Sequence, residues 1–484
     1  MAKRRRADDN VDDRLSDLPD CLLHDILSNL KARQLVQTCV LSSRWRRLWL
    51  TAPCLDIDAG EFASVASRQD KVRFKPLFGG KDGEEEEEDE ELDRFDDFVD
   101  SLLLRRSGCV SPLGTLRLSM PSAWSIWMRF HFDRRGSNSH TRWVRRGLRC
   151  SPATLDVSGI KLPPLTSGTH RLTKLRLYNV RLHKDFETHL SSGLPVLEDL
   201  EVRCTEMSKI SRIASHTLKN LTVDNSPTTN EGTSLKFAVD APRLSRLHLA
   251  VQFKRLGVFA VTLSETTSPV HASICFLDKA KLRQVQGGCY YWQDDKNLLL
   301  ALCKLLRSLS QTVTSLELSG FQDMAVGEQH IPNFPSPGTP WPAGAYQSQQ
   351  TVQTSADSLP RPMLQAILDA EHNRSPLFPN LKTLVIDKCQ IGDNIQTFWS
   401  LLQHTPALEK LTLNNCECEK FRYGAASYTL DKGGTASSLK LVEIIYKDGD
   451  DHEGQDTPQM EKILSMVQRD LPVTTKIHVS KLQK

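Results

Sequence analysis

The stretch LTKLRLYN, residues 172–179, spaces three leucines and a closing asparagine as Leu172-x-x-Leu175-x-Leu177-x-Asn179. In an extended strand alternate side chains point to the same side, so Leu175 and Leu177 share one apolar face. A periodic return of such a unit predicts stacked repeats. The spacing returns, complete or in part, at residues 197–204, 218–225, 244–249, 313–318, 381–386 and 408–413, and more weakly at 113–118, 155–157 and 439–444.

This is the spacing of leucine-rich repeats. One repeat leaves its apolar edges open, so neighbouring repeats stack into a parallel sheet that helices can back. The apolar segments Leu298–Leu309 and Thr397–Leu402 are expected to supply such helices, and another is expected from Phe95 to Leu103. We therefore predict an α/β fold, an irregular leucine-rich-repeat solenoid with a parallel concave sheet, over residues 94–320 and 377–446.

The stretch DLPDCLLHDILSNLKARQLVQTCVLSSRWRRLW, residues 17–49, has helical periodicity instead. Apolar residues from Leu22 to Leu30 predict a first helix, and those from Leu35 to Val40 predict a second. Ser42 or Ser43 is expected to cap a third helix that carries the two tryptophans. Domains below about 40 residues rarely build a sufficient core alone. We therefore expect a partner to cover the apolar face of these helices.

The same stretch resembles an F-box. The resemblance rests on Leu18-Pro19, the Ile26-Leu27 pair, the Val36/Val40/Leu41 stripe and the run Ser43–Trp49. The following Pro53–Asp58 resembles plant F-box proteins that continue into leucine-rich repeats. The resemblance implies a short N-terminal three-helix module that docks on a Skp-type adaptor and, through it, on a cullin. The residues expected to bind the adaptor, some of which must instead hold the helices together, are Leu18, Pro19, Leu22, Leu23, Ile26, Leu27, Leu30, Val36, Val40, Leu41, Trp45 and Leu48.

Charge divides the N-terminal part of the chain into three segments. We expect a basic disordered tail at residues 1–10, the F-box at 11–58 and an acidic flexible linker at 61–93. The linker contains the uninterrupted acidic block Glu84–Glu91, whose like charges repel one another.

Two further segments interrupt or end the repeats. Residues 321–376 are rich in Pro, Gly, Ser and Gln, and proline at that density removes backbone donors. This segment is expected to be either a disordered insertion or a loop that folds on a partner. By its placement, the segment 447–484 resembles the small C-terminal domain of many plant F-box/repeat proteins. It is expected to cap the last repeat with a helix from Thr457 and a strand over Val473–Val479.

Bulk properties place few constraints on partners. The formal net charge is only +3, and the 12 cysteines include no C-x-x-C pair, which is typical of a reducing compartment. There is neither an apolar run of about 20 residues nor a signal-peptide pattern, so we expect an intracellular protein without a membrane partner. The cluster Lys3–Arg6 indicates either a nuclear import signal or a solvated tail, so the expected location is the nucleus, the cytoplasm or both.

No motif for catalysis stands out. The sequence contains no phosphate-binding G-x-x-x-x-G-K-[ST], no G-x-S-x-G and no H-E-x-x-H, and its 14 histidines are dispersed. We predict no catalytic residues, no metal site and no cofactor, and hence a non-catalytic protein.

Residues between the leucines of each repeat should face the concave side of the sheet and meet a target protein. Charges of both signs alternate there, which favours a protein partner read by charge over nucleic acid. The hypothesis is a substrate-recognition subunit of a Skp–cullin–F-box ubiquitin ligase. The alternative is a scaffold that binds partners without ubiquitin transfer. The residues expected to bind the target are Lys174, Arg176, Tyr178, Asp199, Glu201, Arg203, Arg246 and His248.

Overall fold

The chain divides into two compact units. The first comprises Met1–Glu206 with Ala214–Leu218, and the second comprises Met207–Ile213 with Lys219–Lys484. The predicted basic tail, residues 1–10, lies outside the residues described by this computed structural model. The described residues are 18–62, 82–109, 111–120, 137–165, 168–205, 210–225, 235–251, 259–276, 292–320, 323–324, 361–362, 378–388, 390–391, 402–415, 417–418, 438–446 and 474–481.

The first unit begins with the predicted helices: α1 (Asp20–Ser28), α2 (Ala32–Gln37) with a 3-10 turn η1 (Thr38–Val40), and α3 (Trp45–Thr51). Helical spacing brings one apolar side of each helix into a common core. The expected serine cap is wrong, because the residue before α3 is Arg44 and no side chain caps that end. The largest core side chains are Leu23, Leu27, Leu35, Trp45, Leu48 and Trp49.

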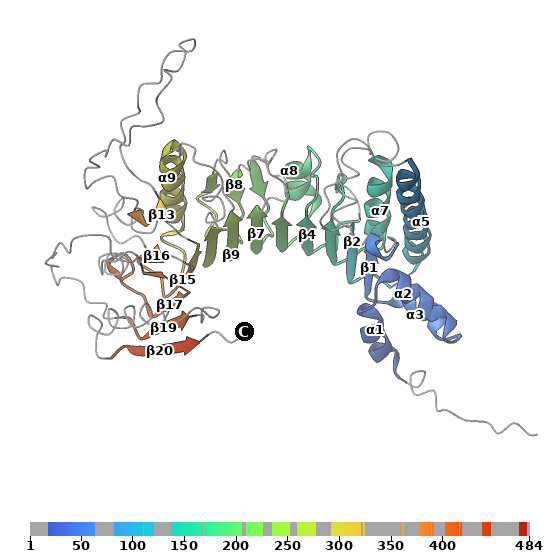
Figure 1. Ribbon diagram of the computed structural model, residues 1–484, viewed down its shortest axis with the longest axis horizontal. Coiled ribbons are helices and arrows are strands. Elements are labelled where there is room, and N and C mark those ends of the chain that lie inside the picture. Colours follow the sequence, from blue (N-terminus) through green and yellow to red (C-terminus); the bar gives the residue numbers. More distant parts are fainter. Residues whose placement is uncertain are drawn as a thin grey trace, which may run out of the picture. The chain divides into compact units, whose positions relative to one another are not determined.

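Five parallel strands follow in the first unit: β1 (Cys54–Asp58), β2 (Thr115–Ser119), β3 (Thr154–Ser158), β4 (Lys174–Tyr178) and β5 (Asp199–Arg203). They pair in sequence order, and each residue of one strand lies opposite the corresponding residue of the next. Figure 1 shows the strands side by side. Inward residues such as Leu175 and Leu177 are buried, whereas the residues between them are exposed. Alternation along each strand therefore gives the sheet one apolar face and one open face.

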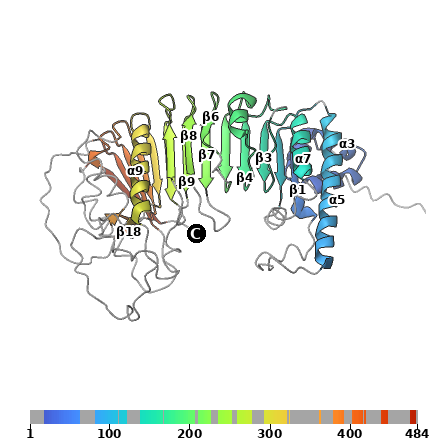
Figure 2. The same ribbon diagram turned by 90° about the horizontal axis from the view of Figure 1, so that it is seen from above.

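Two long helices, α5 (Asp82–Ser107) and α7 (Ser137–Arg149), lie side by side in this unit (Figures 1 and 2). A Cβ atom added at Gly147 of α7 would collide with the Leu116 side chain of β2, so this helix packs directly on the apolar face of the sheet. The backbone of α5 contradicts the prediction of a flexible linker for residues 82–93. Glutamate is a good helix former, and acidic residues are stabilised at the positive N-terminal end of a helix.

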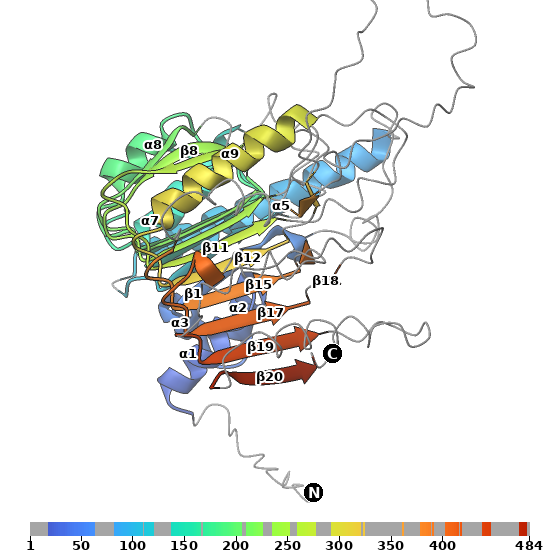
Figure 3. The same cartoon turned by 90° about the vertical axis from the view of Figure 1, so that its left-hand side faces the viewer.

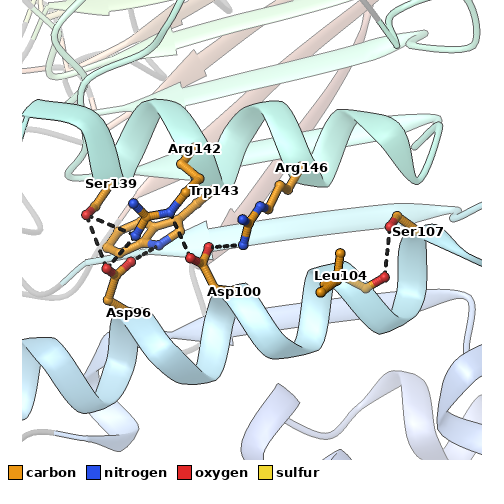
Figure 4. A network of polar contacts seen from close by, with 8 residues as sticks. All are labelled: Asp96, Asp100, Leu104, Ser107, Ser139, Arg142, Trp143 and Arg146. Carbon is orange, nitrogen blue, oxygen red and sulfur yellow. Dashed lines mark hydrogen bonds and ion pairs between the residues drawn. The ribbon is translucent and has the colours of Figure 1, made fainter.

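Ion pairs and hydrogen bonds, one of them from the Ser139 hydroxyl to Asp96, join α5 to α7 (Figure 4). Arg142 contacts Asp96 through Nη2 at 2.5 Å and Asp100 through Nε at 2.8 Å, while Arg146 Nη1 lies 2.6 Å from Asp100. The Trp143 indole N–H donates to Asp96 Oδ1 at 2.5 Å. These pairs are partly buried, which strengthens them relative to exposed ones and fixes the register of the two helices.

The remaining short helical segments of the first unit are η2 (Ala59–Glu61), α8 (Phe186–Thr188) and the π turn η3 (His189–Gly193). Among them, η2 directly follows β1 and leads the chain toward Phe62. That ring contacts both Phe95 and Phe98 of α5, with centroids 5.4 and 5.1 Å apart. An aromatic cluster thus ties the segment after the first strand to the first long helix.

The second unit contains a parallel sheet of eight strands: β7 (Asn220–Asn225), β9 (Arg246–Val251), β11 (His271–Phe276), β12 (Ser315–Ser319), β15 (Thr383–Asp387), β17 (Lys410–Asn414), β19 (Leu441–Tyr446) and β20 (Lys476–Lys481). Each strand pairs with its neighbour in this order. Figure 3 shows β15, β17, β19 and β20 side by side. The final strand agrees with the expected cap strand, although it begins three residues later.

Smaller elements complete the second unit. A three-stranded sheet orders β6 (Arg212–Ala214), β8 (Leu235–Asp240) and β10 (Phe259–Leu263) with β8 in the middle, and helix α9 (Trp292–Leu309) matches a predicted backing helix. Two short pairs join β13 (Asp323–Met324) to β14 (Arg361–Pro362) and β16 (Gln390–Ile391) to β18 (Glu417–Cys418).

The observed strands and helices test several of the predicted segments. The first short pair lies inside the predicted insertion 321–376, so the expectation of no regular structure is wrong at those four residues. The rest of that insertion, the expected helix from Thr457 and most of Thr397–Leu402 lie outside the described residues. The ten leucine patterns all form strands, and the leucine-rich-repeat architecture is confirmed.

A left-handed residue follows many of the strands and turns the chain away from the sheet. For example, the Asn179 amide donates to the carbonyl of Arg203, the last residue of β5, at 2.9 Å, and the Gly320 amide donates to that of Asp387, the last residue of β15, at 2.8 Å. Asparagine and glycine tolerate this backbone conformation best. We call these positions the corner residues: Gly159, Asn179, Cys204, Gly320, Lys388 and Asn415.

Candidate protein interface

Four apolar side chains of the three-helix module face solvent. Leu22 and Ile26, one turn apart on α1, are 47% and 41% exposed, and Val40 and Leu41, between α2 and α3, are 87% and 58% exposed. Pro19 at the start of α1 is also exposed. We call Leu22, Ile26, Val40 and Leu41 the docking patch. Several exposed large apolar side chains on one small module favour a protein-interaction site.

The other residues predicted to bind an adaptor take a different place. Leu18, Leu30 and Val36 are half-buried. Leu23, Leu27, Trp45 and Leu48 are buried among the three helices, so the structure assigns these four to the internal core and they are withdrawn from the docking set. The physical reason is the helical period: neighbouring positions such as Leu22 and Leu23 lie on different sides of one helix.

Arg44 fixes the entry to α1. Its Nη2 atom donates to the Leu18 carbonyl at 2.7 Å and contacts Asp20 Oδ1 at 2.5 Å, and its Nε atom lies 3.2 Å from the same oxygen. The start of α3 is thereby joined to the residues on either side of Pro19. Sequence reasoning missed this role, although Arg44 lies within the basic run that marks the third helix.

Lys31 and Arg33 fasten the three-helix module to the segment after it. Lys31 Nζ lies 3.1 Å from Asp56 and 3.2 Å from Asp58 of β1. Arg33 donates to the Glu61 carbonyl at 2.7 Å, and its guanidinium lies 5.0 Å from the centroid of the Phe62 ring. Burial alone would lower the pKa of Lys31, but the hydrogen bonds and charges of the two aspartates outweigh it and raise the pKa.

On the open face of the first-unit sheet, five charged residues stand opposite one another on successive strands. Asp56 pairs in register with Arg117, Arg117 with Asp156, Asp156 with Arg176, and Arg176 with Glu201. We call these five residues the charge row. Opposite charges placed directly across strands stabilise a sheet by roughly 0.2–1 kcal/mol per pair.

The distances within the charge row differ along it. The Arg117 guanidinium lies 3.7 Å from Asp56 and 3.9 Å from Asp156, whereas Arg176 Nε donates to Glu201 at 3.2 Å. Burial raises the pKa of Asp156, and the neighbouring Arg176 and Arg117 oppose that rise only in part. Asp56, Arg117 and Asp156 were absent from the predicted site, although the same reading between leucines in the weaker copies points to the last two.

Six of the eight residues predicted to bind a target lie together on this open face. Lys174 pairs with Asp199 at 2.9 Å, and Arg203 pairs with Glu201 beside Arg176. Tyr178 is 47% exposed and stands opposite Arg203 in the register of β4 and β5. The charged members therefore already contact one another in the absence of a partner.

Comparison with known proteins identifies relatives that combine an F-box with leucine-rich repeats. Residues 15–55 match the F-box domain family. The meiotic F-box protein MOF of Oryza sativa subsp. japonica is 31% identical over 468 residues, which cover 90% of this chain and 81% of that protein. The chain belongs to the plant family of F-box proteins with leucine-rich repeats. An F-box/FBD/LRR-repeat protein of Arabidopsis thaliana is 28% identical over 272 residues, covering 49% of this chain and 52% of that protein.

Family membership gives this F-box/leucine-rich-repeat protein a role in protein interaction and substrate recognition. F-box domains generally bind Skp1-type adaptors, and proteins of the family are typically receptors. The docking patch lies within residues 15–55, the part of the chain that matches the F-box family.

The last two predicted target residues of this F-box/leucine-rich-repeat protein, Arg246 and His248, belong to β9 of the second unit. Arg246 is exposed, and the His248 ring Nδ1 lies 3.0 Å from the Ser273 hydroxyl on the next strand. Within the described residues, no three His, Cys, Asp or Glu side chains gather as a metal ion would require. No described helix is both long and apolar enough to cross a membrane.

Proposed function

We propose that this protein is the substrate-recognition subunit of a Skp–cullin–F-box ubiquitin ligase. The observation that carries the proposal is the docking patch, because Leu22, Ile26, Val40 and Leu41 expose apolar surface on a module whose own core is already filled. Docking on the adaptor would remove this surface from water at about 25 cal/mol per Å². In this proposal the docking patch binds a Skp-type adaptor and the repeats bind a target protein.

Catalysis in such an assembly comes from proximity. A receptor raises the effective concentration of a target lysine near a ubiquitin-carrying enzyme, and it needs no reactive group of its own. Lys31 and Arg33 support this role, because Lys31 joins the F-box helices to β1 and Arg33 joins them to η2, the turn that follows β1. In this proposal the adaptor-binding end and the first repeats move as one piece.

The test is co-purification of the full chain with a Skp-type adaptor and a cullin. The variant Ile26→Glu with Leu41→Glu places two charges in the docking patch and is expected to abolish recovery of the adaptor. Because both side chains are exposed, the melting temperature of the free chain should not change. The matched control is Leu104→Glu, since Leu104 is a 63% exposed leucine of α5 outside the F-box.

Adaptor recovery by the double variant equal to that of the control would refute the docking proposal. Adaptor and cullin binding without ubiquitin transfer to any bound protein in the reconstituted complex would instead favour the scaffold alternative. The two roles are separated by purifying the protein that binds the docking-patch variant and measuring its cellular level. A ligase receptor predicts that this protein accumulates when the docking-patch variant replaces the parent chain, whereas a scaffold predicts no change.

A further inference from the structure

On the open face of the first-unit sheet, the basic side chains reach further into solvent than the acidic ones. The cations Arg117, Lys174, Arg176 and Arg203 are 45–49% exposed. The carboxylates Asp56, Asp156, Asp199 and Glu201 are only 15–31% exposed. The short acidic side chains stay near the sheet and the longer cations extend past them, so the outermost layer is positive although the charges nearly balance.

An exposed aromatic ring lies at the end of this layer. Tyr178 faces Arg203 across β4 and β5, and tyrosine and arginine are the residues that most often dominate protein interfaces. Arg176 and Arg203 both contact the single carboxylate of Glu201 through their Nε atoms. These two contacts do not occupy the terminal NH2 groups, which are the donors that a guanidinium uses with a second carboxylate.

We propose that this face, centred on Tyr178, binds an extended acidic segment of a partner protein. The inference rests on the proposed function, in which the repeats hold the target. Arg117 and Arg176 lie two strands apart, roughly 10 Å. An extended segment in the polyproline II conformation, with three residues per turn and about 3.1 Å per residue, spans this distance with carboxylates three residues apart on one side. A continuous phosphate backbone fits less well, because Asp156 stands between the two arginines and Tyr178 is the one exposed aromatic ring among the described residues of this face.

The probe is a fluorescein-labelled peptide of 12 residues with Glu at every third position around one central Phe. Binding to the full chain in complex with its adaptor is measured by fluorescence anisotropy at several salt concentrations. Versions with Gln or Lys in place of Glu are compared. The expected order of affinity is Glu, then Gln, then Lys, and only the Glu peptide should weaken steeply with salt.

Variants of the chain locate the site. Arg176→Glu with Arg203→Glu should weaken the Glu peptide at least about 10-fold, and Arg176→Gln with Arg203→Gln should weaken it by a smaller factor. Tyr178→Ala should weaken it about fivefold, and Tyr178→Phe should restore most of that loss. The matched control is Lys236→Glu, which reverses an exposed lysine of β8 on the smaller sheet and should leave affinity unchanged.

Three outcomes would overturn the inference. They are equal affinity for the Glu and Gln peptides, a loss of affinity in Lys236→Glu as large as that in the Arg176→Glu, Arg203→Glu variant, or binding of a single-stranded RNA of matched charge more tightly than the Glu peptide. The last result would assign the face to nucleic acid. Adaptor affinity is measured on the same samples. If the parent chain binds the adaptor but not the Glu peptide, this inference alone is refuted, whereas failure of the parent chain to bind the adaptor refutes the proposed function.

Discussion

Val40 offers the sharpest separation between docking and stability. Its side chain is 87% exposed, so Val40→Ala removes two methyl groups that contact nothing essential in the free chain. Each buried methylene-sized group is worth about 0.8 kcal/mol. If the adaptor covers the exposed part, the substitution should cost about 1.4 kcal/mol of docking energy, which is about a tenfold rise in Kd.

Leu23 is the matched substitution inside the module. It lies in α1 beside Leu22 but is 0% exposed, so Leu23→Ala leaves a cavity among the three helices. Such a substitution typically costs 2–5 kcal/mol of folding stability, about the whole stability of a small module. Its effect on adaptor binding should follow from unfolding, whereas Val40→Ala should leave the stability of the free chain within about 0.5 kcal/mol.

The assay is isothermal titration of each variant with purified adaptor, together with urea unfolding of the free chain. Adaptor binding by Val40→Ala within twofold of the parent would refute a docking role for Val40. Weaker docking by Leu23→Ala with an unchanged unfolding midpoint would refute a purely internal role for Leu23. Either result would mean that exposure in the free chain does not identify the docking residues.

Three further predictions concern residues outside the docking patch. Arg44→Met should weaken adaptor binding about fivefold and speed amide exchange at the start of α1, while Arg44→Lys should retain part of the binding, because lysine keeps one charged donor. Gly320→Ala should destabilise the chain by at least about 1–2 kcal/mol by thermal melting, since its φ is +73° and an added Cβ would meet the Phe276 carbonyl. Burial lowers the pKa of His140 to about 4. Below pH about 6.5, His140 is therefore protonated in the unfolded chain but stays neutral in the folded chain. The free energy of unfolding should fall by up to about 3 kcal/mol between pH 6.5 and 4, and His140→Asn should remove most of that pH dependence.

The leucine spacing predicted the repeat strands because a buried strand needs apolar residues at every second position. It missed β11, because His271–Phe276 carries Ala272 and Ile274 at its inward positions and no leading leucine. The smaller sheet of β6, β8 and β10 was missed for a related reason, since its inward residues include Phe237, Val239 and Phe259, with no leucine period.

The candidate site was only partly predictable. Helical spacing identifies the apolar residues of the F-box but cannot say which side meets the internal core, and only the packing of α1 against α3 separates Leu22 from Leu23. The pairing of Lys31 with Asp56 joins residues 25 positions apart, and no local pattern encodes it. The start of α5 at Asp82 was missed because the charge density of Glu84–Glu91 was weighed above the helix propensity of glutamate.

The corner at Gly320 has a consequence for the segment that follows it. Its amide closes on Asp387, so β12 and β15 are joined in register whatever the chain does between them. The entropy of closing a loop rises only slowly with its length, by about 0.6 kcal/mol for each doubling. A change in the length of the chain between β12 and β15 is therefore expected to cost little energy, so a reporter domain inserted between these strands should leave their pairing intact.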